Sequence, residues 1–247
     1  MTTDNDEAAP ETATEPLIGS SFRAASRVFA QVGLKLSLIY LLCTIPAIMA
    51  EIAMGPKAEG LGGIAMLMVL GGAGGSFASG GIVAATVNIL RDDPGPENDF
   101  WRNCMRFFIP MFIAGLCLLG AMTIGLVLLI IPGFIVLSYF LFASPAIVIE
   151  EKGPLAALER SMALGRGRRF EVFWFLMAIV IIYAVVVVSG ALLLAQGSAS
   201  TIIVNGIAEA IFGAYTLMLS VAGYLILTGQ QPHTATGDPG QGVIRNG

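Results

Sequence analysis

The chain has 247 residues, of which 56% are hydrophobic and only 12% charged, and its formal net charge is −4 at pH 7. Soluble domains carry about 25% charged residues, so this chain lacks the polar surface that a water-soluble globule of its size needs. Its composition, with a mean hydropathy of +0.82, therefore excludes an ordinary soluble protein and predicts one membrane domain with short tails.

Both ends of the chain are predicted to lie outside that domain. Residues 1–16 contain five acidic side chains, no basic one, and much Thr, Ala and Pro. Such a segment cannot bury enough apolar area to offset its chain entropy. Residues 229–247 have a similar composition, so we predict disordered tails at 1–16 and 229–247 and a transmembrane domain at 17–228.

The membrane domain is predicted to be an all-α, polytopic bundle of about six spans. A bilayer core about 30 Å thick needs about 20 apolar residues of helix at a rise of 1.5 Å per residue. Six apolar stretches approach or exceed this length. They cover about 36–54, 64–90, 110–131, 133–149, 170–195 and 201–228.

The third and fourth stretches are separated only by Ile131, Pro132 and Gly133. Together they hold about 40 apolar residues, too many for one crossing even with tilt. Pro132 lacks an N–H group and disfavours helix at Ile131, while Gly133 permits positive φ. We therefore predict a tight helical hairpin that turns at Pro132 and Gly133.

Lys and Arg residues set the predicted orientation. They collect on the cytoplasmic side of membrane proteins. With six spans and both termini inside, twelve of the thirteen basic residues fall on the cytoplasmic side and only Lys57 falls outside. This asymmetry predicts an N-in, C-in protein of a bacterial-type inner membrane, and it also favours two spans over one around Pro132.

Short amphipathic helices are predicted in the cytoplasmic connectors. Ser20 or Ser21 can cap a helix that leads into the first span, and Asn98 or Asp99 can cap another before the third.

The connector between the fourth and fifth spans predicts a third such helix. Pro154 suits a first helical position, and Gly165 or Gly167 suits a stop. Leu155, Leu158 and Met162 recur at the spacing of one helix face. We expect that face to lie on the inner leaflet.

Small residues recur every four positions in the second stretch. Gly71, Gly75 and Ser79 form one row, and a parallel row holds Gly72, Ser76 and Gly80. Small residues at this spacing let helices approach closely in lipid. Packing within the bundle is the first interpretation, while contact with a second copy of the chain and the lining of a conduit are alternatives.

One acid lies inside the last stretch. Glu209 follows Asn205 by one turn, and Glu51 occupies a similar level near the outer end of the first span. A carboxylate in hydrocarbon is costly, so it usually faces protein or water and often marks a pathway. The sixth stretch is long enough to place Glu209 at the interface, and a functional cavity open to the outside is the alternative.

A polar cluster is expected at the inner boundary. Glu150 and Glu151 leave the fourth span just before a helix that carries Arg160 and Ser161. A salt bridge from Arg160 that fixes this helix to the bundle is the first interpretation. Recognition of a lipid headgroup or a partner by Arg160 is the alternative.

Catalytic and cofactor motifs are not found in the sequence. The single histidine, His233, falls in a predicted tail, and Cys43, Cys104 and Cys117 have no C-x-x-C spacing. Metal sites and acid–base chemistry usually draw on such residues. We therefore expect no enzyme, no cofactor and no metal, and the lack of a basic stripe argues against nucleic acid.

A segment around the predicted hairpin and surface helix resembles a known pattern. It reads IPGFIVLSYFLFASPAIVIEEKGPLAALERSMALGRGRRFEVF and combines a helix break at Pro132-Gly133 with Glu150 and Arg160-Ser161. The pattern resembles the YciC-like bacterial membrane protein families and the membrane domain attached to some glycerophosphoryl diester phosphodiesterases. The resemblance implies a similar six-span fold and membrane location. It does not carry over phosphodiesterase activity, because this chain has no such catalytic domain.

Three functional interpretations follow from these patterns. The leading one is a non-enzymatic inner-membrane protein that supports membrane or envelope homeostasis through lipids, other membrane proteins or a second copy of itself. The runner-up is a small transporter or channel with a polar site near Glu209. A membrane enzyme acting on lipids is third, and it would require a pair of acids that converge on one pocket.

Overall fold

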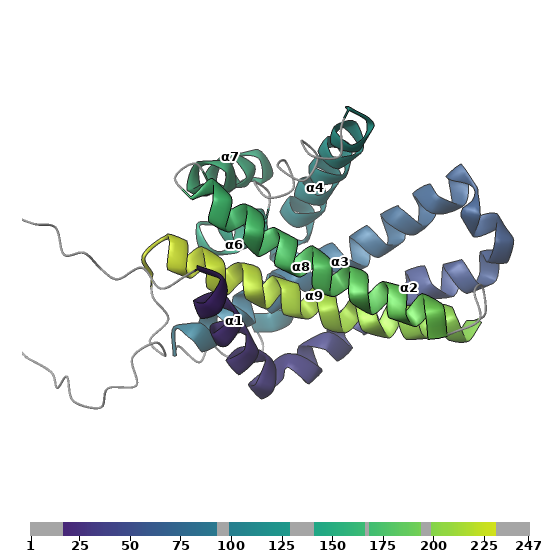
Figure 1. Ribbon diagram of the computed structural model, residues 1–247, viewed down its shortest axis with the longest axis horizontal. Helices are drawn as coiled ribbons and strands as arrows, with labels where there is room; N and C mark the ends of the chain where they lie inside the picture. Colours follow the sequence, from purple (N-terminus) through teal and green to yellow (C-terminus); the bar gives the residue numbers. More distant parts are fainter. Residues whose placement is uncertain (1–16, 93–98, 129–140, 166–167, 194–198, 231–247) are drawn as a thin grey trace, which may run out of the picture.

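The computed structural model describes residues 17–92, 99–128, 141–165, 168–193 and 199–230, and in these ranges every regular element is a helix (Figure 1). Both predicted tails, apart from Gly229 and Gln230, and the predicted hairpin at Pro132 and Gly133 lie outside the described residues. The all-helical part of the sequence prediction is confirmed.

The helices follow the apolar stretches of the sequence. In chain order they are α1 (Leu17–Val28), the π-helix η1 (Phe29–Gly33), α2 (Leu34–Met54), the 3-10 helix η2 (Gly55–Glu59), α3 (Leu61–Leu90), α4 (Asp99–Leu128), α6 (Ala143–Ile149), α7 (Pro154–Gly165), α8 (Arg169–Leu193) and α9 (Ala199–Leu227).

Within the described ranges, four helical segments are long and apolar enough to cross a bilayer. They are Leu17–Met54, Gly62–Leu90, Asp99–Ala121 and Ser200–Leu227, and α8 adds a shorter apolar stretch over Phe170–Val185. These segments identify the chain as a membrane protein. The predicted fourth span is described only in part, as the seven-residue α6.

The predicted boundaries hold for some helices and not for others. The second and sixth stretches correspond closely to α3 and α9. The short helix predicted before the third span is not a separate element, because α4 continues from Asp99 through Pro110. In a membrane helix, neighbouring groups can satisfy the backbone carbonyl that a proline leaves free, so a proline need not end the helix.

Helix α1 is an amphipathic helix that continues into α2 through a bend. Its buried residues recur at helical spacing and are Leu17, Ser21, Ala24, Ala25 and Val28. The five residues of η1 have π-helical geometry, a common cause of bends in helices. Figure 1 shows the change of direction between α1 and α2. The helix begins at Leu17, so the predicted cap at Ser20 or Ser21 is wrong.

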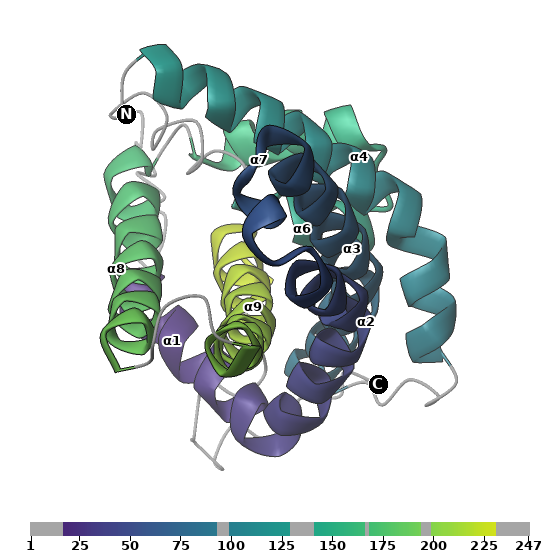
Figure 2. The same ribbon diagram turned by 90° about the vertical axis from the view of Figure 1, so that its right-hand side faces the viewer.

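Helix α9 forms the centre of the bundle. It packs against α1, α2, α3, α6 and α8, and Figure 2 shows it between α8 on one side and α2 and α3 on the other. Over its apolar window 56% of the residues are buried, compared with 11–33% in the other three candidate spans. The burial is concentrated in the second half of α9, whereas Ile203, Val204 and Ile207 in its first half are exposed.

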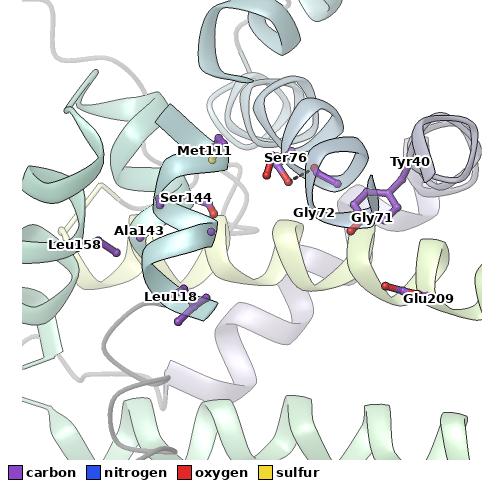
Figure 3. A pocket seen from close by; sticks show the side chains of 14 residues that line it. Tyr40, Gly71, Gly72, Ser76, Met111, Leu118, Ala143, Ser144, Leu158 and Glu209 are labelled. Atoms are coloured by element: carbon purple, nitrogen blue, oxygen red, sulfur yellow. Dashed lines mark hydrogen bonds between the residues drawn. The ribbon is translucent and has the colours of Figure 1, made fainter. Parts of the chain in front are cut away.

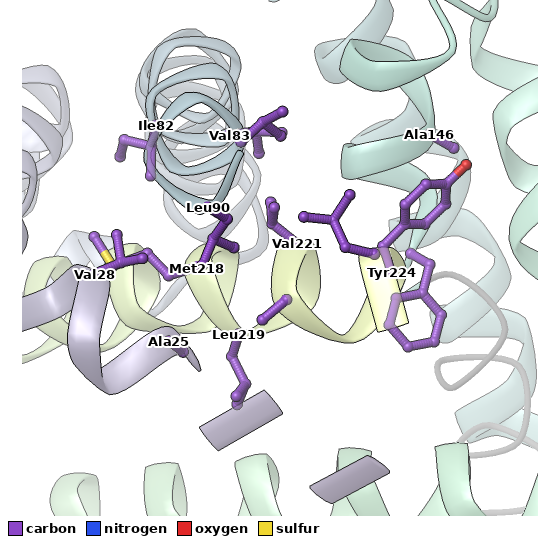
Figure 4. Close-up of a cluster of buried hydrophobic side chains, with 14 of the residues drawn as sticks. Ala25, Val28, Ile82, Val83, Leu90, Ala146, Met218, Leu219, Val221 and Tyr224 are labelled. Atoms are coloured by element: carbon purple, nitrogen blue, oxygen red, sulfur yellow. The ribbon is translucent and has the colours of Figure 1, made fainter. Parts of the chain in front are cut away.

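The apolar core lies where α1 and α3 meet the second half of α9. Val28 of α1 and Ile82 and Leu90 of α3 are buried there with Met218 and Leu219 of α9 (Figure 4). Such burial in lipid gains little from solvent exclusion, so close packing supplies most of the stability. This core fixes the position of α9, the helix that carries residues of both sites described next.

Candidate functional site: two cavities that meet at Glu209

Glu209 lies deep along α9. The helix begins at Ala199, ten residues earlier, and a rise of 1.5 Å per residue places Glu209 about 15 Å from that end. Half of a hydrocarbon core is about 15 Å. The Glu209 side chain is nevertheless exposed rather than buried between the helices. An ionisable group at this depth is expected to face water or protein rather than lipid.

One cavity runs from Glu209 toward the end of the bundle that carries Glu51. Its volume is about 330 Å³, and α2, α3 and α9 line it. Four of its lining residues are polar: Thr44 and Glu51 of α2, and Asn205 and Glu209 of α9. We call it the outer cavity, because the sequence predicts that this end faces outward. The structure thus places the predicted residues Glu209 and Asn205 in one space with Glu51.

A second cavity extends from Glu209 in the opposite direction. Its volume is about 320 Å³, and it reaches α4, α6 and α7. Its polar lining includes Tyr40 of α2, Ser76 and Ser79 of α3, and Ser144 of α6. Figure 3 shows Glu209 and Tyr40 at one end, with Ala143, Ser144 and Leu158 at the other. We call it the inner cavity.

The two cavities share one stretch of wall. Gly71, Gly72 and Glu209 line both of them. A Cβ atom on Gly72 would have no heavy atom within 4 Å, and one on Gly71 would meet only Ala47, at 3.8 Å. Because glycine has no side chain, open space remains beside Gly71 and Gly72, at the level of the Glu209 carboxylate. None of the described residues that line either cavity is Lys or Arg.

The small-residue helix α3 has two roles. Ser79 donates a hydrogen bond to the carbonyl of Gly75 (2.6 Å) and also lines the inner cavity. At Gly75 a Cβ would lie 2.9 Å from the Tyr40 hydroxyl oxygen. The closest backbone approach to α2 is at Gly74, which belongs to neither predicted row; a Cβ there would overlap the carbonyl oxygen of Cys43.

The same helix also approaches α4. An added Cβ at Gly80 would lie 2.8 Å from the carbonyl oxygen of Asn103, and one at Gly81 would lie 2.5 Å from Cys104 Sγ. The small residues near Gly80 therefore bring α3 and α4 together, whereas Gly71 and Gly72 lie at the open side of α3. Helix packing and the lining of a space occur on different parts of one helix.

A second polar site lies at the other end of α9. Glu150 follows α6, and its Oε1 atom accepts a hydrogen bond from Arg160 Nε at 2.9 Å. Its Oε2 atom lies 2.7 Å from Lys152 Nζ, and the Tyr224 hydroxyl donates to the same carboxylate. We call Glu150, Lys152, Arg160 and Tyr224 the Glu150 hub. Here the structure places Arg160 on Glu150, as the salt-bridge interpretation predicts.

Two neighbours of the hub contribute structurally. Ser161 is fully buried, and its Oγ accepts a hydrogen bond from the Phe142 backbone N–H at 3.1 Å, which ties α7 to the start of α6. Glu151 pairs with Arg106 of α4 at 2.7 Å, but both side chains are more than half exposed. An exposed pair of this kind contributes little to stability.

Helix α7 confirms the helix predicted after Pro154, and its position on the inner leaflet stays a prediction. It runs from Pro154 to Gly165, as the sequence indicates. Its buried face holds Ala157, Leu158 and Ser161, whereas Leu155 is exposed. Because α7 packs on α4 and α6, the smaller residues face the protein. The apolar face predicted from Leu155, Leu158 and Met162 therefore combined residues from two faces of α7.

Sequence reasoning missed Tyr224, which is fully buried and joins α9 to Glu150. A tyrosine near the end of a span usually reads as an interfacial anchor. It also missed Tyr40, which lines the inner cavity. A hydroxyl-bearing ring within a span was the available signal for Tyr40. Glu209, which lines the same cavity, lies on a helix about 170 residues away.

The Glu150 hub predicts a defined pH dependence of stability. Burial raises the pKa of Glu150, but the three hydrogen-bond donors of the hub outweigh burial and lower that pKa from 4.5 to about 2. A carboxyl group whose pKa is lowered by folding stabilises the protein above its unfolded pKa and loses that effect as pH falls through its folded pKa.

We therefore expect Glu150→Gln to lower the melting temperature in detergent at pH 7, on the order of 5 °C. The difference from wild type should shrink between about pH 4.5 and pH 2. Thermal unfolding curves of the two proteins across pH 2–7 measure it. A difference that stays constant over that range would contradict the role assigned to the Glu150 carboxylate.

Comparison with known families assigns the chain to one of them. A match to the domain of unknown function DUF7847 covers residues 18–229, from α1 to the end of α9. The chain belongs to the DUF7847 family. Both cavities and the Glu150 hub lie within the DUF7847 region. Neither a curated protein nor a solved structure matches the chain. The family match points to neither the YciC-like families nor the phosphodiesterase membrane domain, so that resemblance stays a prediction.

Proposed function

We propose that this DUF7847 protein is a six-span inner-membrane transporter or channel for a small cation, with both termini in the cytoplasm. The observation that carries the proposal is the pair of cavities that meet at Glu209 and at the open glycines Gly71 and Gly72. Together they extend from Glu51 near one end of α2 to Ser144 on α6. Transporters commonly place a polar site near the bilayer midplane between helices.

The arrangement of charges supports the proposed orientation. Lys57 lies in η2, which joins α2 and α3 at the Glu51 end. Arg91 binds Gln230 after α9, Arg106 binds Glu151, and both of these contacts lie away from η2 at the ends of other helices. Basic residues favour the cytoplasmic side, so the outer cavity faces outward in this proposal.

The charge of the lining supports a cation. Glu51 and Glu209 line the outer cavity, and its described lining contains no basic residue. In a medium of low dielectric constant a carboxylate attracts a cation more strongly than it does in water. A volume of about 330 Å³ accommodates a partly hydrated metal ion or a small organic cation. An anion would meet only negative charge.

Transport replaces homeostasis as the leading interpretation because of Glu209. From the sequence, an interfacial position for this acid was the simpler alternative, and a supporting role in the membrane then ranked first. A carboxylate about 15 Å along a central helix, at the wall shared by two cavities, favours a pathway instead.

Ion flux through the purified full-length chain tests the proposal. Proteoliposomes with a gradient of one salt, the chloride of potassium, sodium or choline, and with sorbitol as osmotic balance separate cation from anion permeability by the sign of their diffusion potential. We expect a cation-selective potential that empty liposomes of the same lipid do not develop. Permeability equal to that of empty liposomes for potassium, sodium and choline would contradict the proposal.

A further inference from the structure

The inner cavity ends against the segment formed by α6 and α7. Ala143 and Ser144 of α6 and Leu158 of α7 line this end. Figure 3 shows these three residues at the end of the cavity opposite Glu209. A solute that passes Glu209 toward the cytoplasm therefore meets α6 and α7 next.

The α6–α7 segment has few means of holding its own shape. Its helices have 7 and 12 residues, and helices this short are marginal without tertiary contacts. The link between them is strained, because Glu151 has a φ of +49°. Non-glycine residues rarely adopt this conformation, and it persists only where surrounding contacts enforce it.

The Glu150 hub connects this segment to α9, and the exposed Glu151–Arg106 pair connects it to α4. Glu150 lies in the link, Arg160 lies on α7, and Tyr224 lies on α9. Tyr224 is fully buried. On the apolar side the Phe142 ring stacks on Phe175 of α8 with centroids 6.2 Å apart. Loss of the hub would leave apolar contacts and the Glu151–Arg106 pair, and an exposed pair of this kind contributes little to stability.

We propose that the α6–α7 segment is the inner gate of the pathway and that the Glu150 hub holds it closed. This inference rests on the proposed function. Opening separates Glu150 from Tyr224 of α9, moves Ser144 and Leu158 away from the end of the inner cavity, and connects that cavity to the cytoplasm. Helix α9 carries both Glu209 and Tyr224, so one rigid helix links the cation site to the gate.

Thiol labelling at Ser144 tests the gate. The test uses the full-length chain with Cys43, Cys104 and Cys117 replaced by alanine and with Ser144→Cys as the reporter. A membrane-impermeant maleimide is applied to the cytoplasmic side of inside-out vesicles. We expect Tyr224→Phe or Glu150→Gln to raise the labelling rate of the reporter at least about 10-fold.

Two controls separate gating from general loosening. Glu151→Gln breaks the neighbouring exposed pair with Arg106 and should leave the labelling rate unchanged. A second reporter, Glu159→Cys on the exposed face of α7, should label at the same rate in every background. Tyr224→Phe preserves the ring and its packing, so it keeps the test valid even where Glu150→Gln does not fold.

The outcomes distinguish the gate from transport. Labelling requires no flux, so a rise with Tyr224→Phe supports the gate even in a protein that passes no ion. Cation flux together with an unchanged labelling rate in folded Tyr224→Phe and Glu150→Gln would overturn the gate and leave the proposed function standing. Equal acceleration of both reporters would also overturn it, because the hub would then hold the whole bundle and not a gate.

Discussion

Glu209→Gln is expected to reduce cation flux at least about 100-fold while leaving the protein folded. Two unit charges about 4 Å apart attract each other by about 4 kcal/mol at an effective dielectric constant of about 20. Glu209 lines both cavities, so each cation must pass it. Glutamine has nearly the same shape and lacks the charge. The diffusion potential of reconstituted vesicles measures the loss.

The control for this substitution is Glu159→Gln. Glu159 is exposed on α7 and lines neither cavity, so its neutralisation changes the net charge equally without touching the pathway. We expect flux within twofold of wild type. The folded fraction of Glu209→Gln should equal or exceed that of wild type, because a neutral side chain costs less at this depth than a carboxylate. Undiminished flux in Glu209→Gln would remove Glu209 from the pathway.

Gly74→Ala is expected to destabilise the bundle by about 3 kcal/mol, the upper range for overpacking. The added Cβ would overlap the carbonyl oxygen of Cys43 and lie 3.4 Å from Thr44 Cα. These are backbone atoms of α2, so no side chain can rotate away, and α2 and α3 must separate. Close approach at glycine is a principal source of helix association in lipid. Thermal unfolding in detergent measures the effect.

Gly72→Ala is the matched control for stability. It lies two residues earlier on α3, and an added Cβ would meet no heavy atom within 4 Å. Alanine favours helix over glycine by about 1 kcal/mol, so we expect this variant to be as stable as wild type or more stable. Equal melting temperatures for Gly74→Ala and wild type would show that α2 and α3 do not pack at Gly74.

Local patterns predicted some elements closely. Helix α7 begins at Pro154 because proline suits a first turn, and it ends at Gly165 because glycine suits a stop. Helices α3 and α9 follow apolar stretches longer than 20 residues. These properties depend on each segment's own residues and on transfer into lipid, so they could be predicted without knowledge of the neighbouring helices.

Other features depend on contacts between distant segments and escaped prediction. Pro110 does not end α4, because a proline in a membrane helix is tolerated where its surroundings satisfy the backbone. Leu155 is exposed and Ala157 is buried, because α7 packs its smaller residues on α4 and α6. Gly74 and not Gly71 makes the closest approach to α2, since the rotation of α3 about its axis selects the contact.

Hydropathy and charge patterns are enough to predict an all-helical membrane protein with an acid in its last apolar stretch and a polar cluster at Glu150, Glu151, Arg160 and Ser161. Hydropathy and charge are sums over nearby residues, so they need no tertiary information. The central position of α9, the place of Glu209 at two cavities and the contact of Tyr224 with Glu150 follow from the packing of the helices. Those relations depend on the rotation and crossing of helices. Contacts between distant segments set them, as between Tyr224 and Glu150, 74 residues apart, and between Ser26 and Tyr215, 189 residues apart.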